Sequence, residues 1–177
     1  YPGSGNVNLF VQRVLPNEPA DIAIVLLGTN NTVYGTTPSD YRANLQFIVS
    51  TLLYAGTGRV ILLTPPPMPE NGYIDFFRQG TPQTTALLVA YRDQVLDICN
   101  MVQHVDCIDI YDIMAANESL YFYDGMLHPN DAGHAFIHQQ IMTRVVPEPS
   151  SFVLLTSGLF GLYFLDRRRN NVRTNDH

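Results

Sequence analysis

The chain has 177 residues, of which 46% are hydrophobic and 15% charged, so it is long and apolar enough for one domain with a sizeable core. This composition excludes an intrinsically disordered chain. The formal net charge of -6, with no basic stripe outside the C-terminal tail, argues against nucleic acid as a partner.

The first half of the sequence predicts an alternation of helices and strands. Apolar residues at helical spacing predict a helix over residues 7–14. The run 21–27, which is apolar from residue 22 onward, predicts a strand buried on both faces, and a polar loop over residues 28–32 follows it. A helix is expected over residues 38–54, and a second buried strand over residues 60–63, before three prolines.

The second half continues the alternation. We expect a loop over residues 68–80, whose Tyr73, Phe76 and Phe77 either line a pocket or serve ordinary packing. A helix over residues 82–103, a strand over residues 105–110, a helical turn over residues 111–116 and a helix over residues 132–145 follow. This order predicts a three-layer α/β/α fold with a parallel sheet covered on both faces, and active sites of such folds collect at the carboxyl ends of strands.

The stretch from Tyr123 to His134 is the strongest candidate for chemistry. It places Asp124 and His128 on a loop before a helix, with Pro129 expected at the first helical position. An imidazole there suits a general base whose tautomer is held by the carboxylate. The alternative is a surface turn with both side chains solvated.

The cysteines and histidines do not predict a metal site. Cys99 and Cys107 match no redox motif, and we interpret them as separate buried apolar side chains, with pairing in an oxidising compartment as the alternative. A zinc site of His128, His134 and His138 is disfavoured because no glutamate lies between the last two to act as base.

The C-terminal tail is distinct from the preceding domain. Residues 146–150 break the last helix, the run from Phe152 to Leu165 carries no charge, and three arginines follow at residues 167–169. The run is shorter than the ~20 residues of a usual membrane span. The flanking prolines and arginines nevertheless favour a C-terminal transmembrane helix over a buried core helix.

Three blocks together resemble the SGNH (GDSL-type) family of esterases and lipases. Ser4-Gly5 follows a small-residue turn, Gly28-Thr29-Asn30 ends a buried strand, and Asp124 and His128 precede the last helix. The run over residues 59–68 is similar to the isoamyl-acetate-hydrolysing esterase branch. The resemblance implies a flavodoxin-like hydrolase domain over residues 1–145, incomplete at its N-terminus and needing no cofactor or metal.

The resemblance also implies a role for each site residue. Gly5 would donate its backbone N–H, and Asn30 its side-chain N–H, to the oxyanion of a tetrahedral intermediate. His128 would be the general base and Asp124 its orienting acid. From the residues alone, Gly5 is otherwise a turn glycine, and Asn30 a turn residue that caps its own loop.

The sequence departs from the family pattern at two places. The Gly-Asp-Ser block with the nucleophile comes before the Ser-Gly block in the family, so we expect the first strand and the nucleophile to be absent from these residues, and the chain alone to be inactive. Ser4 matches the neighbour of the oxyanion glycine. The family also places the acid three residues before the histidine, where this chain has Gly125, and Asp124 lies four before.

The tail resembles a PEP-CTERM sorting signal. Pro147, Glu148 and Pro149 precede the apolar run and the arginine cluster, so this segment would span residues 146–169, with a polar tail at 170–177. The resemblance implies export in a Gram-negative bacterium, inner-membrane anchoring through residues 152–165, and removal of the tail by an exosortase. The mature protein would lie at the cell surface or in the extracellular matrix.

We therefore expect an exported serine ester hydrolase that acts through an acyl-enzyme. Its substrate would be a small acyl ester, an acetylated polysaccharide or a lipid. A non-catalytic surface or matrix binding module that retains the fold is the alternative.

Overall fold

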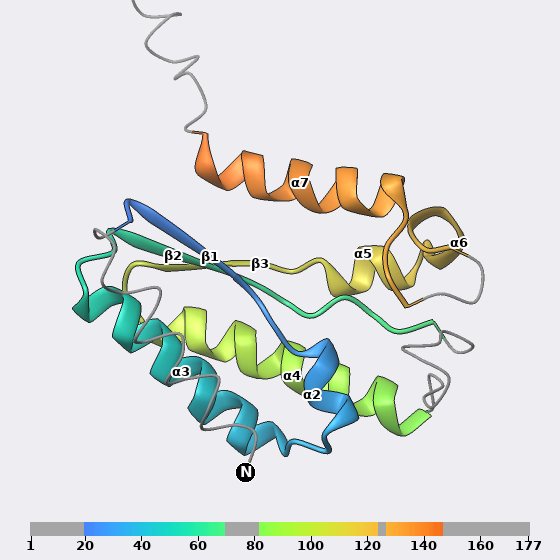
Figure 1. Ribbon diagram of the computed structural model, residues 1–177, viewed down its shortest axis with the longest axis horizontal. Coiled ribbons are helices and arrows are strands. Elements are labelled where there is room, and N and C mark those ends of the chain that lie inside the picture. Colours follow the sequence, from blue (N-terminus) through green and yellow to red (C-terminus); the bar gives the residue numbers. More distant parts are fainter. Residues whose placement is uncertain (1–19, 70–81, 124–126, 147–177) are drawn as a thin grey trace, which may run out of the picture. The chain divides into compact units, whose positions relative to one another are not determined.

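The computed structural model describes residues 20–69, 82–123 and 127–146. The chain divides into two compact units after Ile141, and the arrangement below is that of the first (Figure 1). The helix predicted over residues 7–14, the aromatic residues of the 68–80 loop and the tail after Val146 lie outside the described residues.

The described sheet has three parallel strands. β1 (Ile22–Leu26), β2 (Arg59–Leu63) and β3 (Val105–Ile108) lie in the order β1-β2-β3. β1 and β2 pair from their first residues, Ile22 with Arg59, and β3 pairs with β2 from Val105 opposite Val60. The predicted α/β fold with a parallel sheet is confirmed.

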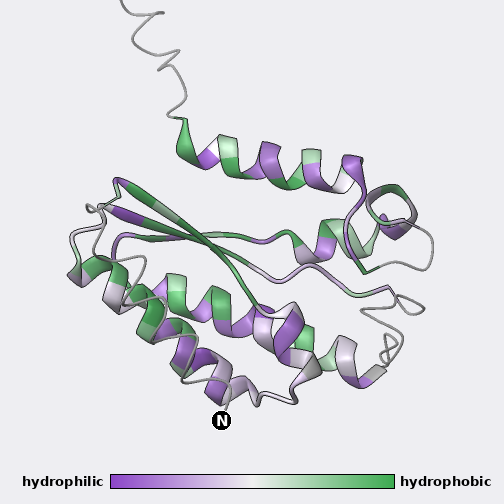
Figure 2. Cartoon of the chain, viewed as in Figure 1, coloured by the Kyte–Doolittle hydropathy of each residue, from purple (hydrophilic) through white to green (hydrophobic). Residues whose placement is uncertain are grey.

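Two long helices, α3 (Pro38–Tyr54) and α4 (Pro82–Met101), pack side by side against one face of this sheet (Figure 1). The α3 helix begins at its predicted residue because Thr37 accepts a hydrogen bond from the Asp40 backbone N–H at 3.1 Å. The strands are apolar over most of their length, whereas α3 and α4 alternate apolar and polar residues (Figure 2). The core between the two layers includes Leu45, Val49, Val60, Leu62, Leu88, Val95 and Ile98.

The two longer strands differ in burial. Val60, Ile61, Leu62 and Leu63 of β2 are at most 1% exposed, as expected for a strand buried on both faces. In β1, Ala23 and Val25 pack against the core, but Ile24 and Leu26 on the alternate face are 47% and 39% exposed. The expectation that the first strand is buried on both faces is therefore wrong for β1.

Four shorter or later helices complete the described chain. They are α2 (Thr29–Val33), α5 (Tyr111–Ala115), α6 (Glu118–Tyr121) and α7 (Asp131–Val145). The loop predicted over residues 28–32 is therefore wrong, because α2 starts directly after Gly28. The α7 helix begins at Asp131, two residues later than Pro129 at its first position would require. Asn130 caps it instead by accepting a hydrogen bond from the Gly133 N–H at 2.9 Å.

A disulfide joins Cys99 of α4 to Cys107 of β3, with the Cα atoms 5.9 Å apart. The interpretation of the two cysteines as separate side chains is wrong. His104, with φ of 63°, turns the chain back after α4, so the end of the helix lies over β3 within the range that a disulfide spans.

In the part of the chain that the structure describes, no helix combines the length and apolar character needed to cross a bilayer. The run from Phe152 to Leu165, on which the transmembrane prediction rests, lies outside that part. The transmembrane helix stays a prediction.

Candidate active site

A pocket of about 250 Å³ opens at the carboxyl end of the sheet. The segment after β1 and the turn before α7 both line it, so Asn30 and His128 lie on one cavity although they are far apart in the sequence. The remaining lining residues are Leu26, Leu27, Gly28, Thr29, Asn31, Pro66 and Leu127.

Asn30 occupies the second position of α2 and is exposed. The residue before this helix is Gly28, and no side chain caps the helix at that end. Asn30 makes no side-chain hydrogen bond with any residue that the structure describes, whereas Asn31 donates to Thr36 Oγ1 at 3.3 Å. The Asn30 amide therefore remains available to a ligand in the pocket.

Gly28 determines how closely the α2 segment approaches β2. Its φ of 136° is a conformation that L side chains rarely adopt. A Cβ atom at this position would lie 2.8 Å from the Cβ of Pro65 and 3.4 Å from the hydroxyl of Tyr41. That hydroxyl donates a hydrogen bond to the Leu27 carbonyl at 3.0 Å. Only glycine fits here, and its absence of a side chain lets the chain just before α2 pack against Pro65.

The turn that carries His128 is held from both sides. Leu127 is 4% exposed, and Pro129 forms an isolated antiparallel bridge with Phe122. The Asn130 side chain donates to the Leu120 carbonyl at 2.9 Å and to the Phe122 carbonyl at 3.2 Å. His128 itself is exposed between these anchors. The backbone on each side of the imidazole is thus fixed while the ring faces the pocket and solvent.

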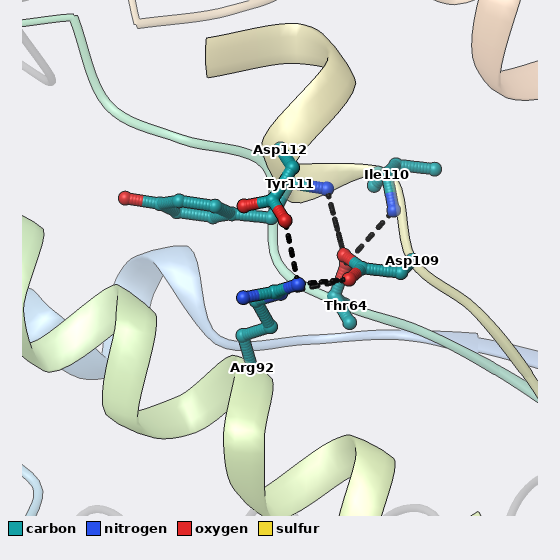
Figure 3. Close-up of polar contacts among 6 residues, drawn as sticks. All are labelled: Thr64, Arg92, Asp109, Ile110, Tyr111 and Asp112. Atoms are coloured by element: carbon teal, nitrogen blue, oxygen red, sulfur yellow. Dashed lines mark hydrogen bonds and ion pairs between the residues drawn. The ribbon is translucent and has the colours of Figure 1, made fainter. Parts of the chain in front are cut away.

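A partly buried polar network follows the ends of β2 and β3 (Figure 3). Thr64, fully buried at the end of β2, donates to Asp109 at 3.0 Å and accepts from the Ile110 N–H at 3.0 Å. Arg92 of α4 donates to Asp109 at 2.7 Å and to Asp112 of α5 at 2.7 Å. The hydrogen bond with Asp109 raises the pKa of the Arg92 guanidinium. These contacts fix the end of β2 from which Pro65 and Pro66 continue.

The other predicted site residues fall elsewhere. Gly5 and Asp124 lie outside the described residues, as does the sorting motif at Pro147, Glu148 and Pro149. His134 and His138 are exposed on α7. Within the described ranges, no three histidine, cysteine or acidic residues come together as a metal site.

Sequence reasoning missed the apolar part of the pocket. Leu26, Leu27, Pro66 and Leu127 form this part, beside the two polar candidates. The only signal for Leu26 and Leu27 is their place at the end of an apolar run, and that pattern is equally typical of a buried strand. For Pro66, the sequence indicates only that a strand ends before it.

Residues 3–136 match the sequence model of the GDSL-like Lipase/Acylhydrolase family. The chain belongs to this family. Residues 145–169 match the PEP-CTERM protein-sorting motif. A search of the curated proteins found no match.

Solved structures of other enzymes share the fold. The lipase/acylhydrolase from Enterococcus faecalis superposes with a TM-score of 0.57 at 19% identity, over 81% of this chain and 69% of that one. A salicylyl-acyltransferase from a tetracycline biosynthetic pathway superposes with a TM-score of 0.55 at 22% identity, over 76% of this chain and 39% of that one. These similarities establish the fold of the described GDSL-like domain.

Proposed function

We propose that this protein is an exported serine ester hydrolase whose reaction takes place in the Asn30–His128 pocket. The observation that carries the proposal is that the two side chains line one cavity at the carboxyl end of the sheet. A hydrogen-bond donor and an imidazole on the same cavity are two of the groups that acyl transfer requires. Membership in the GDSL-like family supports ester bonds as the target.

In the proposed mechanism, His128 takes the proton of a serine hydroxyl as the serine oxygen attacks the ester carbonyl carbon. The oxyanion that forms accepts a hydrogen bond from the Asn30 amide and one from the Gly5 N–H. The protonated His128 then gives its proton to the departing alcohol, and an acyl-enzyme remains. Water, deprotonated by the same imidazole, then attacks the acyl carbon, and His128 returns the proton to the serine oxygen as the acid is released. Asp124 orients the ring.

The nucleophile is assigned to none of the serines in this sequence. Ser4 matches the neighbour of the oxyanion glycine, and the family pattern places the reactive serine in a Gly-Asp-Ser block. Turnover is therefore tested on the protein as its gene encodes it. Within the family, we propose that the chain belongs to the isoamyl-acetate-hydrolysing branch.

Export is supported by two independent features. The PEP-CTERM motif at residues 145–169 is of the kind that an exosortase recognises. The Cys99–Cys107 disulfide is typical of proteins that fold in an oxidising compartment. We propose inner-membrane anchoring through residues 152–165 before processing, and then a place at the cell surface or in the extracellular matrix of a Gram-negative bacterium.

Hydrolysis of p-nitrophenyl acetate tests the function. The protein encoded by the gene should hydrolyse the ester and be labelled by a fluorophosphonate, and His128→Ala should abolish both. His138→Ala, at an exposed histidine away from the pocket lining, is the control and should retain the rate. Hydrolysis by the 177-residue chain alone that disappears in His128→Ala would overturn the assignment of the nucleophile.

The second candidate is a non-catalytic surface or matrix module. The 39% and 47% exposure of Leu26 and Leu27 beside the pocket favours it, because a binding surface needs accessible apolar area. This function predicts no fluorophosphonate labelling and no ester turnover by the gene-encoded protein. Either positive result would exclude it.

A further inference from the structure

Two buried tyrosines hold the segment that carries Asn30 at its two ends. The Tyr41 hydroxyl, from α3, donates to the Leu27 carbonyl at 3.0 Å, three residues before Asn30. The Tyr91 hydroxyl, from α4, donates to the Thr36 carbonyl at 2.5 Å, on the far side of α2. Both hydrogen bonds are accepted by main-chain carbonyls, so they restrain the backbone of the segment and not one of its side chains.

The two tyrosines also contact one another. Their rings stack with centroids 4.4 Å apart and planes at 25°, and the residues are only 3% and 0% exposed. Each ring has a single preferred position in the packed core, so each hydroxyl is held by the helix that carries it. The segment from Leu27 to Thr36 is therefore fixed to α3 and α4 through one rigid pair.

The segment needs such support because α2 has only five residues. A helix of this length is unstable by itself, since the cost of its first turn is not recovered by further hydrogen bonds. Within the segment, Asn31 N–H donates to the Gly28 carbonyl and Thr36 N–H donates to the Asn31 carbonyl. These local bonds shape the segment, but they do not place it relative to the sheet.

Packing alone would not require the hydroxyls. A buried hydroxyl without a partner is costly, so phenylalanine is the residue that a purely apolar contact between α3 and α4 favours. Here both hydroxyls are paired, and both with the same segment. This arrangement indicates a polar attachment that serves the segment and is built into an otherwise apolar core.

We propose that Tyr41 and Tyr91 are positioning residues that hold the α2 segment so that the Asn30 amide faces the developing oxyanion. The inference rests on the proposed ester hydrolysis. An oxyanion donor acts only if it is held in place before the reaction, because reorganisation during the reaction would cancel the gain. Asn30 is exposed, and the segment it belongs to is anchored at both ends by hydroxyls from the core.

Tyr41→Phe and Tyr91→Phe test the proposal, since each keeps the stacked ring and removes one hydroxyl. Tyr111→Phe is the matched control, because Tyr111 is also buried, at 7% exposure, and its side chain is not bonded to α2. Amide hydrogen exchange is measured on the folded 177-residue chain. We expect exchange at Asn31, Gly35 and Thr36 to rise about two- to tenfold in the first two variants, the range for one lost hydrogen bond.

The exchange of the β2 amides serves as the internal reference and should not change. In the gene-encoded protein, both phenylalanine variants should lower kcat by a similar factor and leave KM unchanged, because the Asn30 contact is made only in the transition state. Tyr111→Phe should change neither exchange in the segment nor kcat.

Three results would overturn the proposal. Unchanged exchange across residues 27–36 in both variants would show that the hydroxyls do not hold the segment, whatever the activity. Faster exchange with unchanged kcat, in a protein that Asn30→Ala impairs, would show that the attachment does not serve catalysis. If Asn30→Ala and His128→Ala both retain full turnover, the proposed function fails, and the positioning role fails with it.

Discussion

A Cβ atom at Gly28 would lie 2.8 Å from the Cβ atom of Pro65, so the α2 segment and the end of β2 meet without room for a methyl group. This contact joins the two parts of the sheet edge that line the pocket. It also explains why a glycine stands between β1 and α2. The first prediction concerns this position.

Gly28→Ala should destabilise the protein by about 2–4 kcal/mol, because alanine adds a clash with Pro65 to an unfavourable φ of 136°. Gly35→Ala is the control, since Gly35 has φ of 62° but no atom within 4 Å of its added methyl group. It should cost only about 1 kcal/mol. Urea unfolding measures both, and equal losses would show that the contact with Pro65 is unimportant.

Gly133→Ala should also destabilise the protein, although alanine has a higher helix propensity than glycine. Alanine in α7 would by itself be favoured by about 1 kcal/mol. Its methyl group would instead meet the Tyr121 carbonyl and the Pro129 ring, which belong to the turn that holds His128. We expect a net loss of about 1–3 kcal/mol in the free energy of unfolding.

The control for Gly133 is Ala135→Gly, at an exposed position of the same helix. It changes only helix propensity and should cost about 1 kcal/mol. If Gly133→Ala proves stabilising, the close approach of α7 to the α6 turn is wrong.

Thr64→Val should cost about 2–4 kcal/mol although it keeps the side-chain shape. The valine removes the donor to Asp109 and the acceptor of the Ile110 and Tyr111 N–H groups in a fully buried site. Thr57→Val is the matched control, at a buried threonine that makes no side-chain hydrogen bond with the described residues. A loss of equal size in both would exclude the network in Figure 3 as its cause.

Stability should fall steeply above pH 10 because of Tyr41. Burial, and to a lesser extent the neighbouring Tyr91, raises the pKa of Tyr41 above its ordinary value of about 10. Above pH 10 the folded state keeps this proton and the unfolded chain releases it, so the free energy of unfolding decreases as pH rises. Below pH 10 both states are protonated, and the contribution of Tyr41 is fully present.

Tyr41→Phe should reduce that alkaline slope by up to about 1.4 kcal/mol per pH unit. Tyr54→Phe should leave the slope unchanged, because the Tyr54 side chain is 95% exposed. Unfolding by urea at several pH values between 9 and 11.5 measures the slope. A Tyr41→Phe slope equal to that of the wild type would contradict the burial of this hydroxyl.

Local sequence pattern predicted most of the fold and singled out Asn30 and His128 as candidates, which both line the pocket. The runs around Ile24 and Ile61 are apolar and β-branched, and Thr37 and Pro38 are strong start signals, so the strands and α3 could be placed within a residue or two. The disulfide could not be predicted, because it depends on how the end of α4 folds back over β3.

The same limit applies to the site. Asn30 and His128 follow recognisable blocks, but their common pocket depends on the packing of Gly28 against Pro65 and on the capping of α7 by Asn130. From the sequence alone, Tyr41 and Tyr91 are recognisable only as aromatic residues on the apolar faces of two helices. Which backbone atoms their hydroxyls contact is set by tertiary structure alone.

The central claim is that the Asn30–His128 pocket is the site of ester hydrolysis. Its most direct test is the steady-state hydrolysis of p-nitrophenyl acetate by the gene-encoded protein and its Asn30→Ala variant, with Asn117→Ala as the control at an exposed asparagine. We predict that Asn30→Ala lowers kcat by about 10²–10³ with little change in KM, as expected for loss of an oxyanion donor, and that Asn117→Ala retains kcat. A wild-type kcat in Asn30→Ala would contradict the claim.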